Sequence, residues 1–333
     1  MTENRFSALP REVWVAAGLL FGYVAFVCWD QMFYWETHED FSFGYLVPFF
    51  VGYVLYERWP KIKTTLIDGG KADGVTSGWV TAICSLVAWG AWGVSLLFLV
   101  FGGMMRISQG PASASTLFIT TGFALFCFSV VYLNSRRDAA GRPIPLLERI
   151  KLTHLFVFPA LAWLISAPMV FVMDSRIKVF LLGWVTQIVF FIFDLLGLPL
   201  QREGNVLILP EGQVGVADAC SGIRSMTACI FAGTFLAAVF LDRAWKKWLM
   251  VSCAILLAFV TNIFRSIFLT AWAYHYGADA IEGTVHDVTG YAVLGVTCVL
   301  LLLLLPIFNY KLPEFNDGQS HPDTDKSASK GPA

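Results

Sequence analysis

The stretch Val288–Asn309, "VTGYAVLGVTCVLLLLLLPIFN", has no charged side chain and decides the class of fold. An α-helix needs about twenty apolar residues to cross roughly 30 Å of hydrocarbon, and this run has that length. Similar runs recur along the chain, unlike the alternating segments of about ten residues that build an outer-membrane barrel. With 57% hydrophobic and 14% charged residues, the chain has too few polar side chains to cover a soluble globule. The sequence therefore predicts an all-α polytopic membrane protein.

Outward from this run, we expect about eight membrane spans and one further apolar helix. The spans are 13–29, 42–57, 78–103, 113–133, 152–173, 220–241, 248–276 and 288–309. The first span lacks the small-residue cleavage site of a signal peptide, so we expect it to be retained. Residues 1–312 then form one membrane domain, and 313–333, rich in Ser, Asp, Lys, Pro and Gly, form a disordered cytoplasmic tail.

The charges of the loops orient the bundle. Lys and Arg gather in the loops 57–76, 134–151 and 242–247. Loops of this kind stay in the cytoplasm, whereas the acidic loop 30–40 has neither Lys nor Arg and belongs outside. The protein is thus expected to be a multi-pass protein of the cell membrane, with both chain ends inside and the segments 174–219 and 277–287 outside.

The apolar run 177–197 is the one that we expect not to cross. Two cytoplasmic loops must be joined by an even number of crossings, and three apolar runs lie between 134–151 and 242–247. The run 177–197 begins soon after the previous span and contains Gln187 and Asp194, which favours an interfacial or re-entrant helix.

The segment that follows this run changes character. Gly204-Asn205 is a turn signal, and the nearby stretches "VLIL" and "QVGVA" are short β-prone runs. A small extracytoplasmic hairpin is therefore expected before the next span.

Composition also excludes some functions. The formal net charge is −1, and the basic residues lie in short loops where topology explains them, so no nucleic-acid partner is expected. The seven cysteines form no CxxC pair, and neither a metal nor a cofactor is expected. Most of the cysteines lie inside apolar runs, where packing is their ordinary role. Cys220 has polar neighbours, and Cys28 lies near a predicted helix end.

Three polar side chains fall at a similar depth on the outer side, namely Cys220, Arg265 and His286. A charge within a span, such as that of Arg265, costs a few kcal/mol or more in a bilayer and requires a polar partner or cavity. One alternative is a purely structural charge, held by Asn262, Asp287 or backbone carbonyls.

Cys220 stands where a helix is expected to begin. A helix N-terminus and a nearby arginine both lower the pKa of a thiol, which yields the nucleophilic thiolate. Ser221 and Gly222 let a backbone approach closely, and Arg224 lies on the same helix face as Cys220.

His286 is the candidate for proton transfer, because imidazole gains and loses a proton near neutral pH. The alternative for a single histidine is an interfacial residue hydrogen-bonded to a neighbour. His275 competes for the catalytic role but belongs to an aromatic helix end, where membrane-interface residues gather.

These residues resemble a known family. The stretches "ACSGIRS" at 219–225 and "NIFRS" at 262–266, followed by His286, are similar to the pattern of the exosortase/archaeosortase transpeptidases. The resemblance covers most of 30–305, including "FSFGYLVPFFVGYVLYERW" and "LLGLPLQREGNVLILPEGQVGVADACSGIRS". It departs from the family at Phe43, where a histidine is common.

The resemblance implies an extracytoplasmic Cys220–Arg265–His286 active site, with Ser221, Arg224, Asn262 and Asp287 in supporting or substrate-binding positions. Its implied partners are exported proteins whose C-terminal sorting signal joins a short motif such as Pro-Glu-Pro, a transmembrane helix and a basic cluster. The enzyme would cleave this signal through a thioester and transfer the protein to an unknown acceptor of the cell envelope.

Two other classes of function remain open from the residues. An anion transporter or channel would use Arg265 and Arg224 in a cavity, although neither inverted repeats nor paired broken helices are evident. A thiol redox protein would pair Cys28 with Cys220, although the lack of a CxxC motif opposes it.

Overall fold

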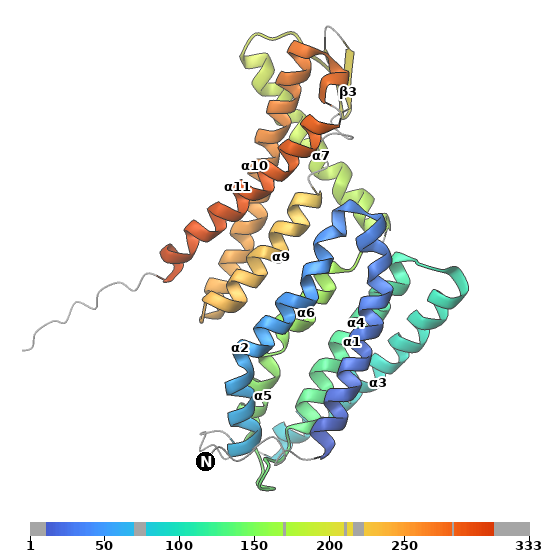
Figure 1. The fold of residues 1–333 in the computed structure, drawn as a ribbon, viewed down its shortest axis with the longest axis vertical. Coiled ribbons are helices and arrows are strands. Elements are labelled where there is room, and N and C mark those ends of the chain that lie inside the picture. Colours follow the sequence, from blue (N-terminus) through green and yellow to red (C-terminus); the bar gives the residue numbers. More distant parts are fainter. Residues whose placement is uncertain are drawn as a thin grey trace, which may run out of the picture.

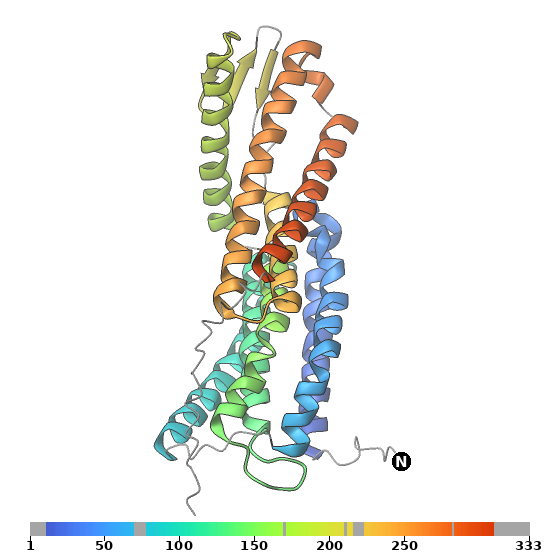
Figure 2. The same ribbon diagram turned by 90° about the vertical axis from the view of Figure 1, so that its left-hand side faces the viewer.

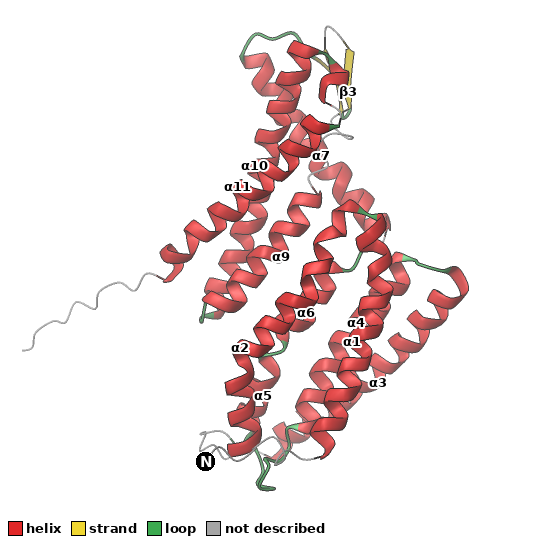
Figure 3. Ribbon diagram, in the orientation of Figure 1, coloured by secondary structure: helices red, strands yellow, loops and turns green. Residues whose placement is uncertain are grey.

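The computed structural model describes residues 11–69, 78–168, 171–209, 212–215, 223–281 and 283–309. Most of them lie in helices that form one elongated bundle (Figures 1 and 3). The helices are α1 (Arg11–Thr37), η2 (Glu39–Leu46), α2 (Val47–Asp68), α3 (Gly78–Gln109), α4 (Ser113–Asn134), α5 (Leu146–His154), α6 (Val157–Ser166), α7 (Phe171–Leu195), α9 (Ile223–Phe240), α10 (Ala244–Tyr276), η3 (Ala278–Ile281) and α11 (Thr284–Asn309). The strands are β1 (Gln201–Glu203), β2 (Val206–Leu209) and β3 (Gly212–Gly215).

The prediction of an all-α polytopic membrane protein is confirmed. Within the described ranges, seven helical segments are long and apolar enough to cross a membrane: α1, α3, α4, α5 with α6, Ser175–Leu195 of α7, α10 and α11. All of these except α7 overlap a predicted span. The predicted spans 42–57 and 220–241 correspond to α2, which is charged in its second half, and to α9, whose apolar part is Met226–Phe240.

α7 occupies a separate level of the molecule. It packs against α10 and β2, and in both views it lies beyond the ends of α1 and α4 rather than among them (Figures 1 and 2). Near its start, Lys178 Nζ lies 3.4 Å from Asp40 Oδ2 of η2. Its length and composition suffice for a span, so its interfacial or re-entrant placement stays a prediction.

The predicted hairpin is present and carries a third strand. β1, β2 and β3 form an antiparallel sheet in that order, with Gln201 opposite Ile208 and Leu207 opposite Val214. Gly204 has φ +62°, the left-handed conformation that the tight turn between β1 and β2 requires. Leu207 is fully buried, and its cluster includes Val189 of α7 and Leu269 of α10, so the sheet is anchored between these helices.

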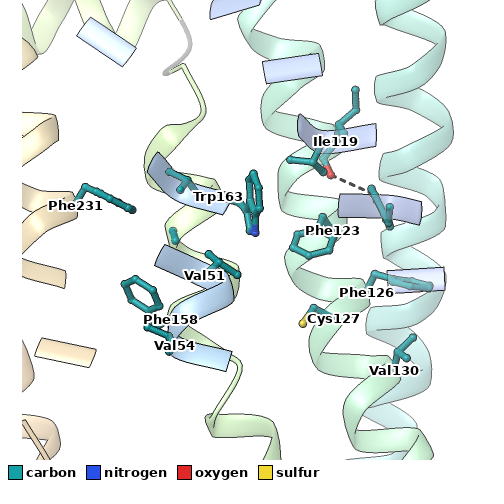
Figure 4. Close-up of a cluster of buried hydrophobic side chains, with 14 of the residues drawn as sticks. Val51, Val54, Ile119, Phe123, Phe126, Cys127, Val130, Phe158, Trp163 and Phe231 are labelled. Carbon is teal, nitrogen blue, oxygen red and sulfur yellow. Dashed lines mark hydrogen bonds between the residues drawn. The ribbon is translucent and has the colours of Figure 1, made fainter. Parts of the chain in front are cut away.

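A buried apolar cluster joins α9 to the rest of the bundle (Figure 4). Phe123 of α4, Trp163 of α6 and Phe231 of α9 belong to it, and Phe231 stacks on Phe50 of α2 with ring centroids 5.5 Å apart. The hydroxyl of Tyr23 donates to Ile119 O over 3.1 Å, which satisfies a polar group that α1 would otherwise bury. The α9 helix is therefore held by the same core as α1, α2, α4 and α6.

The predicted span 152–173 needs correction, because the chain forms α5 and α6 with a break at Leu155 and Phe156 and ends α6 at Ser166. Pro159 has no N–H, so it cannot donate to the carbonyl of Leu155 one turn earlier. The guanidinium of Arg58 from α2 donates to this carbonyl instead, and also to Ala238 O of α9 over 3.2 Å. The break is thus tied to α2 and α9.

Small residues bring α9 against α10. A Cβ placed on Gly233 would lie 2.6 Å from the Cβ of Ala254, a distance that packed carbon atoms do not reach. The small-residue stretch "FAGTFLAA" at 231–238 therefore mediates a helix contact within the bundle.

Candidate active site

Side-chain contacts fix how far α9, α10 and α11 reach along one another. Gly233 of α9 faces Ala254 of α10, and further outward Thr261 Oγ1 lies 2.9 Å from Thr297 Oγ1 of α11. α9 and α10 run antiparallel and touch where Gly233 meets Ala254. Measured along each helix from this contact, the start of α9 at Ile223 and Arg265 of α10 lie almost equally far away. The first turn of α9 is therefore level with Arg265, and α10 extends beyond the start of α9 in both views (Figures 1 and 2).

Arg265 extends from α10 onto the first turns of α11. Its Nη2 donates to the backbone oxygen of His286 over 3.1 Å, and a Cβ placed on Gly290 would lie 3.5 Å from the same nitrogen. Glycine at 290 therefore leaves the guanidinium room against the α11 backbone. The backbone carbonyl proposed as a structural partner of Arg265 is present, and the same contact brings Arg265 and His286 together.

Asn262 lies one turn before Arg265 and is buried. Its backbone oxygen accepts a hydrogen bond of 2.9 Å from Ser266 Oγ, and Ser266 is also buried. This turn of α10 is held internally, so the position of Arg265 along the helix is well defined.

His286 lies in the first turn of α11. Its side chain is 26% exposed, and its Nδ1 lies 3.3 Å from Oδ1 of Asp287, whose side chain is 61% exposed. The His286 backbone oxygen also accepts 2.9 Å from Thr289 Oγ1, so it is fixed by two donors. The imidazole can therefore meet a ligand while its backbone stays in place, and Asp287 is positioned to orient the ring.

The remaining predicted site residues lie at or before the start of α9. Cys220 and Ser221 lie outside the described residues, and the backbone of Arg224 lies in the first turn of α9. One turn later, Thr227 Oγ1 donates to Asp40 O of η2 over 3.2 Å. This bond holds the beginning of α9 against η2.

The position of η2 beside the start of α9 was not predicted from the sequence. Asp40 contacts both Thr227 of α9 and Lys178 of α7, so η2 connects the two helices. Phe43 is partly buried and packs its ring 5.4 Å from that of Phe231, against the core cluster. The departure from the family at Phe43 is therefore compatible with the local packing. The signal available in the sequence was the aromatic and glycine-rich start of "FSFGYLVPFF".

A buried ion pair was also missed. Asp30 of α1 is fully buried, and its Oδ1 lies 2.7 Å from Nε of Arg106 of α3, which also stacks over Trp29 at 5.0 Å. Both charges occur inside apolar helices, where an ionisable residue normally signals a partner.

The competing residues have other surroundings. His275 is exposed at the end of α10, with its ring 5.6 Å from that of Tyr274, and it lies beyond Arg265 along the helix. Cys28 is half-buried and packs against the core cluster of α1 and α4. Among the described side chains, no group of three His, Cys, Asp or Glu could hold a metal ion.

Comparison with known proteins gives one match. A family model described as transmembrane exosortase (Exosortase_EpsH) matches residues 35–303. The matched range begins at the end of α1 and includes η2, all of α9 and α10 and most of α11. No curated protein and no solved structure matches the chain.

Proposed function

The chain belongs to the transmembrane exosortase family, and from this we propose that it is a cysteine transpeptidase acting on exported proteins at the outer face of a cell membrane. The observation that carries the proposal is the bond from Arg265 Nη2 to His286 O. It joins α10 to the first turn of α11 at the level where α9 begins. Two of the three side chains that the chemistry needs therefore come from neighbouring helices at one depth.

The distance along the chain supports Cys220 as the third catalytic residue. Cys220 precedes Ile223, the first residue of α9, by three positions, and three residues span at most about 10 Å. Because the start of α9 is level with Arg265, this chain length allows Cys220 to act at that level. A thiolate beside a helix N-terminus and an arginine is a reactive nucleophile.

The reaction divides into two acyl transfers. The Cys220 thiolate attacks a backbone carbonyl near the sorting motif and forms a tetrahedral oxyanion, which Arg265 stabilises. As the C–N bond breaks, His286 donates a proton to the leaving amine of the C-terminal helix, and a thioester remains. His286 then takes a proton from the acceptor nucleophile, which attacks the thioester and releases the thiolate.

Neighbouring residues support these roles. The contact between His286 Nδ1 and Asp287 Oδ1 favours a proton on Nδ1, which leaves Nε2 to exchange protons with the reacting groups. Asn262 and Ser266 hold the turn that carries Arg265. Ser221 and Arg224 are proposed to contact the substrate. Water in place of the acceptor would make the same steps a hydrolysis.

Charge distribution supports an extracytoplasmic site. The loop between α4 and α5 carries Arg136, Arg137 and Arg142, and α10 is preceded by Arg243. These residues lie at the ends of the helices opposite to the starts of α9 and α11, and such loops stay in the cytoplasm. An exported substrate with its C-terminal helix in the bilayer would then present its motif on the side of Arg265 and His286.

The rival functions receive no specific support from the described residues. Arg265 donates to a backbone carbonyl, and half-buried Cys28 packs against the core cluster.

The proposal is tested by co-expressing the protein with an exported protein that ends in a motif, a helix and a basic cluster. Wild type should shorten this substrate, whereas Cys220→Ala and Cys220→Ser should leave it intact. Cys253→Ser is the matched control, because Cys253 is a half-buried cysteine of α10, and it should process normally. If Cys220→Ala still shortens the substrate, Cys220 is not the nucleophile.

A further inference from the structure

Three adjoining grooves surround the break between α5 and α6, at the end of the bundle that carries the basic loops. One, of about 480 Å³, lies between α3, α4, α5 and α6, and a second, of about 190 Å³, lies between α2, α6, α9 and α10. The third, of about 800 Å³, lies between α2 and α5. His154, exposed at the end of α5, lines all three. Because they share this residue, we call the three together the His154 groove.

Cations line the rim of the His154 groove. Arg58 and Lys247 line its second part, and Lys61 and Lys151 line its third. Lys247 lies within electrostatic range of Arg58 and Lys61, and Asp242 opposes them. Within the described part of the chain, neither Arg58 nor Lys247 has a carboxylate at ion-pair distance, whereas Lys151 pairs with Glu148 at 2.8 Å. Glu57 also acts on Arg58 as an opposite charge, so the cations Arg58, Lys61, Lys151 and Lys247 outnumber the carboxylates Glu57, Glu148 and Asp242 by one and the rim carries a small excess of positive charge.

The floor of the groove is apolar. Its first part, lined by Val87, Ala91 and Phe128, exposes almost only carbon atoms, and its second part is lined by Leu161, Ala237 and Val251. Trp248, 73% exposed, stands at the edge of the second part. Tryptophan beside Lys and Arg is typical of the membrane–water interface, where headgroups and the first methylene groups meet.

We propose that the His154 groove binds one anionic phospholipid of the leaflet at the basic end, with its phosphate against Arg58, Lys61 and Lys247 and its acyl chains along the apolar floor. Charge complementarity selects this occupant. Anionic lipids give the cytoplasmic leaflet its negative surface potential, and each surface lysine or arginine contributes about 1 kcal/mol to their attraction. A transmembrane helix ending in a basic cluster would be repelled by the same rim.

The bound lipid would bridge the two sides of the second part of the groove. The second part of the groove is formed by α2 and α6 on one side and by α9 and α10 on the other. The lipid would thus strengthen the link that Arg58 makes between Leu155 and Ala238. It acts at the opposite end from Arg265 and His286 and is independent of the chemistry proposed there.

The test uses the full-length protein in detergent with phosphatidylglycerol or phosphatidylcholine of identical chains, and counts retained lipid by native mass spectrometry. Lys61→Gln with Lys247→Gln should weaken phosphatidylglycerol binding about tenfold or more, with little effect on phosphatidylcholine. The control, Arg137→Gln with Arg243→Gln, removes the same charge from the basic end outside the groove and should bind as wild type does. Equal binding by the two double variants would overturn the proposal.

A second pair of variants tests the apolar floor. Leu161→Trp fills the groove, whereas Leu256→Trp places the same side chain on an exposed face of α10, and both positions are exposed in the bundle. Only Leu161→Trp should lose phosphatidylglycerol, and inorganic phosphate at millimolar concentration should not displace the lipid. Displacement by inorganic phosphate would indicate a simple anion site, and equal loss in both variants would show that the apolar floor does not bind the acyl chains. Either result would contradict the proposal.

Discussion

At the scale of single residues, Arg265 has the most specific surroundings of the candidate site. Its guanidinium reaches across to the first turn of α11, where it donates to His286 O and lies above Gly290. A planar, permanently charged fork can hold this carbonyl and still face a reacting oxygen, whereas an ammonium group is a single point charge.

Replacement of Arg265 tests whether this arginine is catalytic or only structural. Arg265→Lys and Arg265→Gln should lower substrate processing by roughly 100-fold or more, as loss of an oxyanion donor does in other acyl transfers. Arg243→Lys and Arg243→Gln, at the exposed start of α10, should process as wild type does. The measurement is the initial rate of tail removal at equal amounts of folded protein. Normal processing by Arg265→Gln would show that the arginine is structural.

At the scale of elements, the packing of η2 depends on Gly44, which has no side chain. A Cβ on Gly44 would lie 2.1 Å from Nε1 of Trp35, so alanine cannot be accommodated without moving the indole ring of a buried residue. Since η2 also contacts Thr227 of α9, a shift would reach the start of that helix.

Gly44→Ala should therefore lower the melting temperature of the purified protein and reduce processing. Gly52→Ala is the matched control, because Gly52 lies on an open face of α2 with no atom within 4 Å of the added Cβ. Alanine there should be neutral or slightly stabilising, since it favours helix. The expectation fails if the two variants melt at the same temperature.

The loop between α4 and α5 is organised by Asp138. Burial acts to raise the pKa of this carboxyl, but hydrogen bonds from the backbone and guanidinium of Arg142 and from the Ala140 N–H outweigh it, so the pKa lies below the usual value. Asp138 N and Ala139 N also donate to Arg142 O and Leu66 O, which ties the loop to α2.

A carboxyl with a lowered folded-state pKa stabilises the protein above its unfolded pKa of about 4, and this stability is lost as the pH falls through the lower folded value. Wild type should therefore be more stable than Asp138→Asn at pH 7, and the difference should shrink below about pH 4. Melting curves from pH 7 to pH 3 measure it. A difference that stays constant over this range would contradict the titration.

At the scale of the whole molecule, most of the apolar helices and the hairpin of β1 and β2 could be predicted from local patterns, because apolar length, loop charge and turn residues act locally. The ends of α1 and α3 could not. The predicted spans stop at 29 and 103, but the helices continue to Thr37 and Gln109, and Asp30 and Arg106 pair within the continued parts. Which partner a buried charge finds depends on packing between helices distant in sequence.

The same distinction applies to the site. An arginine inside a span was predicted to need a polar partner, and Arg265 Nη2 donates to the backbone oxygen of His286. The catalytic roles of Arg265 and His286 stay predictions. The break at Leu155 depends on Arg58, and the packing of η2 depends on Gly44 and Trp35, which are tertiary contacts without a local signature. The role of Cys220 stays a prediction.

The most direct measurement of the central claim is the mass of the purified protein after incubation with a sorting-signal substrate. We expect a covalent adduct on Cys220 that equals the substrate without its C-terminal helix and is released by hydroxylamine, as a thioester is. It should accumulate most when the acceptor is withheld, and it should be absent from Cys220→Ser. Substrate cleavage without an adduct on Cys220, or an adduct on another residue, would contradict nucleophilic catalysis by this cysteine.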